Sequence, residues 1–361
     1  MILLEAIQRV ADGVNLSNVS DRQKEQILRK INLAVEAVAK NYFWKDLERS
    51  GQLALVPNYT SGTASISNGS RTVTIASGTV TNAMKGRFFK HENSGGWYRI
   101  VNVDTGANTL ILEVPIQESS ASGLTYEVWK KFYRVNSDVR LVLPCEFPNQ
   151  QFNNYPYNSY QYNNSVMFIP FTIHSVDEYA GTYTTGSVSL TQDSNVVTGS
   201  STVFFDNVFA GDRLRIGNNK YFVQRVESDT RLILQNYSIE AYDGSYVINS
   251  DYPRTAVLNF TTAESSVLNY SYVRRVYDLI NERFDTFPFP REFDTIIIDH
   301  AIGEFKKDTG DVQWPSILQL ATSKLETLRK NSDLEIKPFR QMKAYIPGGN
   351  GRGISNTQYI R

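Results

Sequence analysis

The first fifty residues carry the hydrophobic pattern of a helix. Four apolar residues recur at helical spacing, and charged residues fill the opposite side. They are Ile27, Ile31, Val35 and Val38. Ser20 followed by Gln23 matches a capping box, which predicts that the helix begins there. We expect it to continue to about Leu47 or Glu48, and we expect a weaker helix over residues 2–11.

Helical spacing returns near the end of the chain. Behind Pro288 and Pro290, four apolar residues fall four apart and predict an amphipathic helix of about 16 residues. They are Phe293, Ile297, Ala301 and Phe305. Together with Ile31, Val35 and Val38 they form the predicted helical core. A second helix is expected from about Val312 to Lys330, with a buried stripe. The stripe comprises Trp314, Ile317, Leu318, Ala321, Leu325 and Leu328.

The pattern in the middle of the chain predicts strands and turns, and part of this sequence is repeated. Short runs rich in Val, Ile, Thr and Tyr alternate with Gly, Asn and Ser turns. The stretch GRFFKHENSGGWYRIVNVDTGANTLIL (86–112) matches GDRLRIGNNKYFVQRVESDTRLIL (211–234). The flanking matches are SISNGSRTVT (65–74) with SLTQDSNVVT (189–198), and TYEV (125–128) with SYVI (245–248). We predict that each copy is a small antiparallel β-barrel, closed or half-closed, because an open sheet of this size leaves its edges unprotected.

These patterns define an α+β fold class with five parts. Terminal helices far apart in sequence must pack together to bury their stripes, so residues 1–60 and 251–335 are expected to form one discontinuous helical bundle domain. Two duplicated β-barrel-like modules are inserted in it, module 1 (61–131) and module 2 (182–250). Residues 132–181 are expected to be extended strands with an Asn- and Tyr-rich loop. Residues 336–361 are expected to be an extended C-terminal arm.

Two segments are open to more than one interpretation. FPNQQFNNYPYNSYQYNN (147–164) is favoured as a long irregular loop, with an ordered partner-binding loop as the alternative, since Tyr and Asn are common in interfaces. The C-terminal arm is predicted to order against a partner, and a tail with no role is the alternative. Its candidate residues for binding a neighbour are Tyr345, Arg352, Tyr359, Ile360 and Arg361.

The amino-acid composition of the chain argues against some classes of protein function. The 37 basic and 37 acidic residues give a net charge of zero, which argues against a nucleic-acid binder driven by charge. One cysteine, Cys145, excludes a disulfide within the chain. We find no secretory signal and no apolar run long enough to cross a membrane, so a protein made in a reducing cytoplasm is expected.

Two stretches resemble the head-to-tail adaptor proteins of tailed bacteriophages, also called connector or head-completion proteins. In QILRKINLAVEAVAKNYFWKDLERSGQLAL (26–55) a helix with an Ile-Asn-x-Ala core and a closing Phe-Trp pair leads into a strand. In SYVRRVYDLINERFDTFPFPREFDTIIIDHAIGEF (271–305) a strand ends in a Leu-containing turn before a Pro-x-Pro-x-x-Phe helix start. The repeated module also looks like small β domains of phage neck and tail proteins.

This resemblance implies a structural virion protein of the neck. Such proteins form a ring, commonly of twelve subunits, beneath the portal protein, with a downstream tail or neck protein on the opposite face. Double-stranded DNA passes non-specifically through the channel, and assembly takes place in the host cytoplasm. The two modules would then widen the ring or bind tail and fibre components. The alternative is a virion protein that binds a receptor or glycan through the modules and the aromatic loop.

The sequence predicts neither catalysis nor a cofactor or metal. His300 and Glu304 are four apart, but two ligands are too few for a metal site, and a surface pair explains them better. Cys145 lacks the signature of a nucleophile and is expected to be a packed thiol. GGNGRG (348–353) follows no predicted strand and precedes no predicted helix, so it does not predict a phosphate loop. Arg274 and Arg275 are expected to be solvated strand residues.

Overall fold

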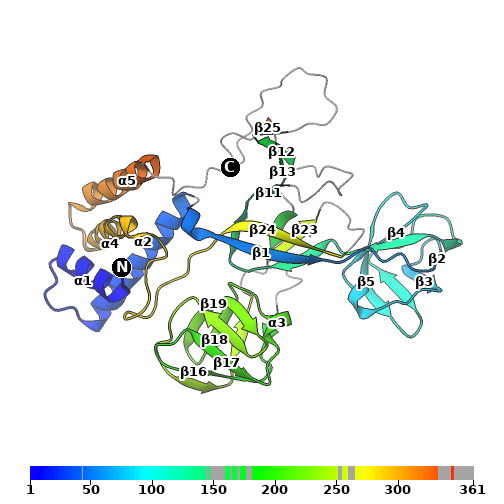
Figure 1. Ribbon diagram of the computed structural model, residues 1–361, viewed down its shortest axis with the longest axis horizontal. Coiled ribbons are helices and arrows are strands. Elements are labelled where there is room, and N and C mark those ends of the chain that lie inside the picture. The colour runs from blue at the N-terminus through cyan, green and yellow to red at the C-terminus, as the bar shows by residue number, and fades with distance from the viewer. Residues whose placement is uncertain are drawn as a thin grey trace.

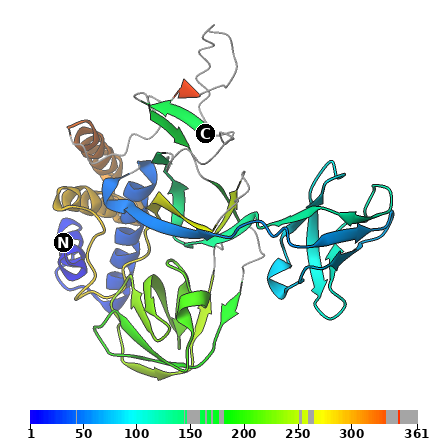
Figure 2. The ribbon, with the colours of Figure 1, turned by 45° about the vertical axis from the view of Figure 1, so that its right-hand side comes forward.

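The computed structural model describes most of the chain. The described residues are 1–42, 44–143, 145–146, 159–162, 165–168, 171–175, 181–250, 254–258, 265–331 and 343–344. It is a mixed helix-and-sheet protein with helices at one end, small sheets in the middle and curled antiparallel half-barrel sheets beside them (Figure 1). Figures 1 and 2 both show module 1 projecting away from the helices, whereas module 2 lies next to them.

Helices from both ends of the chain lie side by side. The long helices are α1 (Leu3–Gly13), α2 (Asp21–Asn41), α4 (Asp294–Thr309) and α5 (Trp314–Asn331). Helix α4 contacts the other three, and both views place α1 and α5 on opposite sides of it. Ser20 caps α2 through the predicted capping box with Gln23, so the start of this helix is confirmed.

The predicted end of α2 is wrong. The helix stops at Asn41, six or seven residues earlier than the predicted Leu47 or Glu48. The reason is Trp44, which is fully buried and whose indole Nε1 donates a hydrogen bond of 2.8 Å to the carbonyl of Val38. This bond satisfies one of the terminal carbonyls of the helix and turns the chain back across its end. A short 3-10 turn, η1 (Lys45–Leu47), then leads into β1 (Glu48–Leu55).

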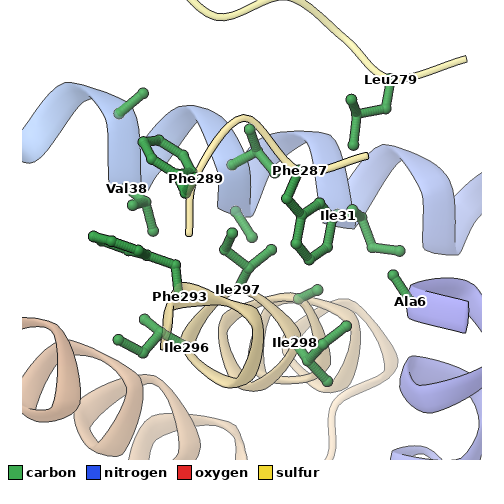
Figure 3. Packing of buried hydrophobic residues seen from close by; sticks show 14 of the residues in the cluster. Ala6, Ile31, Val38, Leu279, Phe287, Phe289, Phe293, Ile296, Ile297 and Ile298 are labelled. Carbon is green, nitrogen blue, oxygen red and sulfur yellow. The ribbon is translucent and has the colours of Figure 1, made fainter. Parts of the chain in front are cut away.

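One hydrophobic cluster joins the helices (Figure 3). It includes Trp44 and Leu47 behind α2 and Phe287 and Phe289 ahead of α4. Six residues of the predicted helical core are buried in this cluster, and Phe305 is partly buried against it. The six are Ile31, Val35, Val38, Phe293, Ile297 and Ala301. Ile297 lies between α4 and α2 in Figure 3, with no exposed surface.

Helix α5 is less buried than predicted. Only Ala321 and Leu325 of its stripe are buried, while the other four residues are half-buried. The four are Trp314, Ile317, Leu318 and Leu328. Helix α5 packs on α4 at Gly303, where an added Cβ would lie 2.6 Å from Cδ2 of Leu318. Because α5 lies at the outside of this helical layer, much of its stripe is not covered (Figure 1).

Two small antiparallel sheets lie between the helices and the modules. One has the strand order β1-β24-β10 and the other β14-β23-β9. Strand β1 pairs along its whole length with β24, from Glu48 opposite Val273 to Leu55 opposite Ser266. The remaining strands are β24 (Ser266–Arg274), β10 (Val139–Val142), β14 (Phe171–Ser175), β23 (Arg254–Leu258) and β9 (Phe132–Val135). The sequence predicted extended chain within residues 132–181 and a strand in each of the two stretches that resemble adaptor proteins, but it did not predict how these strands pair.

Modules 1 and 2 have the same strand order. Module 1 reads β7-β2-β3-β6-β5-β4-β8, and module 2 reads β21-β16-β17-β20-β19-β18-β22 with β15 added at the end. Module 1 contains β2 (Thr63–Ile66), β3 (Thr72–Ala76), η2 (Asn82–Met84), β4 (Phe88–His91), β5 (Tyr98–Asp104), β6 (Thr109–Leu112), β7 (Ala121–Leu124) and β8 (Tyr126–Trp129). Module 2 contains β15 (Thr182–Tyr183), β16 (Ser187–Leu190), β17 (Val196–Ser200), α3 (Phe204–Asn207), β18 (Arg213–Ile216), β19 (Asn219–Ser228), β20 (Arg231–Leu234), β21 (Tyr242–Gly244) and β22 (Val247–Asn249).

Matching residues make matching contacts in the two modules. The hydroxyl of Tyr126 donates to the carbonyl of Ser61 at 2.7 Å, and that of Tyr246 donates to Thr185 at 2.6 Å. The Gly86 amide donates to the carbonyl of Ile100 at 2.9 Å, as the Gly211 amide does to Val223 at 2.7 Å. Both glycines have positive φ, 79° and 87°, which explains why glycine stands at this turn in each copy. These contacts and the shared strand order agree with the alignment of the copies.

A fifth sheet has the order β11-β13-β12-β25. Its strands are β11 (Cys145–Glu146), β13 (Ser165–Phe168), β12 (Ser159–Tyr162) and β25 (Lys343–Ala344). The favoured irregular loop is therefore wrong for Ser159–Tyr162, which pairs with β13 on one side and with β25 on the other. Residues 147–158 and 163–164 of that loop lie outside the described residues.

Candidate interaction surfaces

The segment between β24 and α4, residues 275–290, holds α2 and module 2 together. Asn32 of α2 and Leu279 exchange two hydrogen bonds: the Asn32 side-chain amide donates to the Leu279 carbonyl at 3.1 Å, and the Leu279 amide donates back at 2.9 Å. On the other side, the Tyr277 ring stacks on Phe222 of module 2 with ring centroids 4.0 Å apart. This segment therefore contacts both neighbours at once.

Asp285 is one of two buried carboxylates that anchor module 2. Its carboxylate is buried and accepts four N–H groups at 2.7 to 3.0 Å. Two come from module 2, the side-chain amide of Asn236 and the backbone of Tyr237, and two from the backbone of Ile280 and Asn281. Removing such a carboxylate leaves several buried donors unsatisfied, so the junction is firmly held.

A second buried carboxylate, Asp212, holds the other side of module 2. It pairs with Arg134 of β9 at 2.7 Å and accepts from the hydroxyls of Ser137 and Ser250 at 2.7 and 2.8 Å. The Arg134 guanidinium also lies 4.1 Å from the centre of the Phe209 ring. Neither Asp212 nor Asp285 was singled out from the sequence, because only tertiary contacts distinguish them from surface aspartates.

Asp138 lies at the same junction and is almost completely buried. Burial raises the pKa of its carboxyl to about 6, against the opposing effects of a hydrogen bond from Tyr272 and the nearby charge of Arg274. Arg274 itself donates to Gln235 of module 2 at 2.8 Å. The expectation that Arg274 is a solvated strand residue is therefore wrong, because most of its side chain is enclosed between β24 and module 2.

The helical part exposes large apolar side chains in three places, one of which is Leu33 of α2 at 41% exposed. Beside α1, Ile2, Leu4 and Phe284 are 45%, 50% and 43% exposed, and we call them the α1 patch. At α5, Val312 and Leu320 are 90% and 51% exposed, and we call them the α5 patch. Helices α1 and α5 lie on opposite sides of α4, so the two patches belong to opposite edges of the row of helices (Figures 1 and 2).

His91 in module 1 is buried but is not in a catalytic arrangement. Its Nε2 lies 3.8 Å from a carboxylate oxygen of Glu118, and the same oxygen accepts a 2.5 Å hydrogen bond from Tyr98. Within the described residues neither ring nitrogen of His91 has a hydrogen-bond partner. The matching position in module 2 is Ile216, so a histidine here replaces an ordinary core residue.

The other candidate residues gain no chemical site. His300 and Glu304 are half-buried on α4, and burial lowers the pKa of His300 while Glu304 opposes that shift. In the described part of the chain, no three His, Cys, Asp or Glu side chains come together as metal ligands, and no helix is long and apolar enough to span a membrane. For Cys145 the structure gives only the pairing of its strand with β13.

The residues predicted for binding a neighbour lie outside the described residues. They are Tyr345, Arg352, Tyr359, Ile360 and Arg361. Of the predicted arm, only Lys343–Ala344 is described, as β25.

Comparison with known proteins identifies no relative. No family model, no curated protein and no solved structure matches this chain.

Proposed function

We propose that this chain is a ring-forming structural protein of the bacteriophage neck, a head-to-tail adaptor that joins the filled capsid to the tail. The observation that carries the proposal is the pair of exposed apolar patches at α1 and α5, the two helices that flank α4. Exposed apolar groups of this kind mark association sites. Two different patches on two different helices favour head-to-tail contacts between copies, which close into a ring when the rotation permits.

The residues behind the resemblance also support the proposal. Asn32, from the Ile-Asn-x-Ala core of the first stretch, exchanges hydrogen bonds with Leu279, from the turn of the second stretch. The two stretches are thus parts of one packed unit, in which we place the discontinuous helical domain formed by residues 1–60 and 251–335. In this proposal the domain forms the ring, and the two modules are attached to it as pendant surfaces.

The proposal assigns partners to the faces of this ring. The portal protein lies on one face, a tail or neck protein on the other, and double-stranded DNA passes through the channel without sequence-specific contacts. The arm beyond Asn331 reaches the portal or a neighbouring subunit. A chain with no net charge suits this role, because it lacks the general basic excess that would attract the DNA phosphates strongly.

The α5 patch provides the test. Leu320→Glu places a charge in the proposed contact, and it should leave folding intact because Leu320 is half exposed. We expect the parent to form one large closed oligomer in mass photometry and the variant to fall to small species. Thr322→Glu, also exposed on α5, is the matched control and should retain more of the oligomer. A parent that stays monomeric, or a trimer that binds glycans, would contradict the proposal.

A further inference from the structure

A cavity of about 970 Å³ lies between α2, β24 with the segment that follows it, and module 2. Six of its lining residues are cationic and only two, Glu36 and Asp278, are acidic. The cations are Lys40, Arg140, Arg213, Lys220, Arg274 and Arg275. The whole chain has no net charge, so the excess of positive charge is local to this cavity.

Fixed contacts hold part of this positive lining in place. Arg140 reaches the end of α2, where its two terminal nitrogens donate to the carbonyls of Ala39 and Lys40, the latter at 2.7 Å. Arg274 is held by Gln235 through one nitrogen, while its buried Nε has no hydrogen-bond partner within the described residues. Lys220 is exposed at the start of β19. The cavity therefore combines anchored guanidinium groups with an accessible ammonium group.

The cations also oppose one another. Burial lowers the pKa of Arg140, and the charge of Arg275 lowers it further. Burial likewise lowers the pKa of Arg274, and Arg49 adds to that shift. Because a guanidinium group remains charged near neutral pH even when its pKa is lowered, an anionic ligand would relieve this mutual repulsion.

We infer that this cavity binds an acidic, extended polypeptide segment of a partner protein. Charge complementarity requires anionic groups, and carboxylates match the forked geometry of guanidinium groups. Between the cations lie Phe222, Val276 and Ile280, which suit apolar side chains alternating with the acidic ones. The carboxylates of Glu36 and Asp278 favour a peptide over a DNA strand, because a peptide backbone offers N–H donors and a sugar-phosphate backbone offers none.

The test uses the full chain and fluorescence anisotropy of labelled probes. The probes are a peptide of alternating glutamate and valine, the same peptide with glutamine in place of glutamate, and a single-stranded oligothymidylate. We expect the glutamate peptide to bind, with an affinity that falls as salt rises. The glutamine peptide and the oligothymidylate should bind at least about tenfold more weakly.

Two variants locate the binding. Lys220→Glu should weaken binding of the glutamate peptide about tenfold without affecting folding, since this side chain is exposed. Lys85→Glu changes the charge by the same amount on an exposed turn of module 1 and should leave binding unchanged. The inference is overturned if the glutamate peptide fails to bind, if both variants bind it equally, or if the oligothymidylate binds more tightly. None of these results depends on ring formation, so each is distinct from a failure of the proposed function.

Discussion

Ile297 tests whether the two ends of the chain form one packed unit. Its side chain is fully buried between α4 and α2, in the cluster that contains Val38 from the other end of the sequence (Figure 3). Replacing Ile297 with Asp removes these contacts and buries a carboxylate in an apolar cluster. Ile297→Ala removes the contacts alone.

The expected losses follow from this burial. Truncating a fully buried isoleucine to alanine costs about 2–5 kcal/mol of unfolding free energy. The aspartate adds the cost of desolvating a carboxylate or of keeping it protonated, so Ile297→Asp should cost roughly 3 kcal/mol or more. Thr295→Asp is the matched control: it is exposed on the same helix near the N-terminus, where a negative charge is favourable.

Urea unfolding followed by far-ultraviolet circular dichroism measures these effects through the helical signal. A second experiment combines Val38→Ala with Ile297→Ala. If the two ends pack together, the losses should be non-additive by at least about 0.5 kcal/mol. If Ile297→Asp unfolds at the same urea concentration as the parent, or if the two alanine substitutions are strictly additive, the packing of the chain ends is wrong.

Three further predictions concern the junction and the modules. For Asp138, the folded-state pKa of about 6 lies above the ordinary value of 3.8, so its contribution to stability should be lost as pH rises from about 4 to 6. Asp138→Asn should reduce this pH dependence in urea titrations, and an unchanged profile would contradict the assignment. Asp285→Ala should lower the free energy of unfolding by about 3 kcal/mol or more and lower the unfolding midpoint of module 2. The control Asp243→Ala, at an exposed position, should have little effect. Equal midpoints for the two variants would exclude an anchoring role for Asp285. Gly62→Ala should destabilise module 1 more than Gly69→Ala. Both glycines have positive φ, but only at Gly62 would an added Cβ collide with the backbone, 2.4 Å from the carbonyl oxygen of Ala76. Equal thermal midpoints of the two variants would refute this reasoning.

Sequence patterns predicted correctly those features that depend on interactions between residues close in sequence. The capping box at Ser20, the helical spacing on α4 and the repeated turn glycines each act within a few residues, and the structure has them where they were expected. The end of α2 was missed because Trp44 folds back onto Val38, a contact that helical spacing does not reveal. In the same way, the half-buried face of α5 depends on what covers it and not on its own pattern.

Long-range pairing and buried polar anchors could not be predicted from this single sequence. Strands β1 and β24 lie more than 200 residues apart, and nothing in either strand specifies the other as its partner. Asp285 resembles any loop aspartate until the chain brings Asn236 and Tyr237 to it. The patches of the proposed interfaces were likewise not predicted, because the exposure of Leu4 and Leu320 depends on how their helices pack.

The most direct test of the proposed function is electron microscopy of the purified protein in negative stain. The proposal predicts closed rings of the 40.9 kDa chain with a central channel, commonly of twelve subunits, with the helices at the contacts between subunits and module 1 projecting outward. Class averages that show only single copies or trimers, or rings whose subunits touch through the modules and not through α1 and α5, would contradict it.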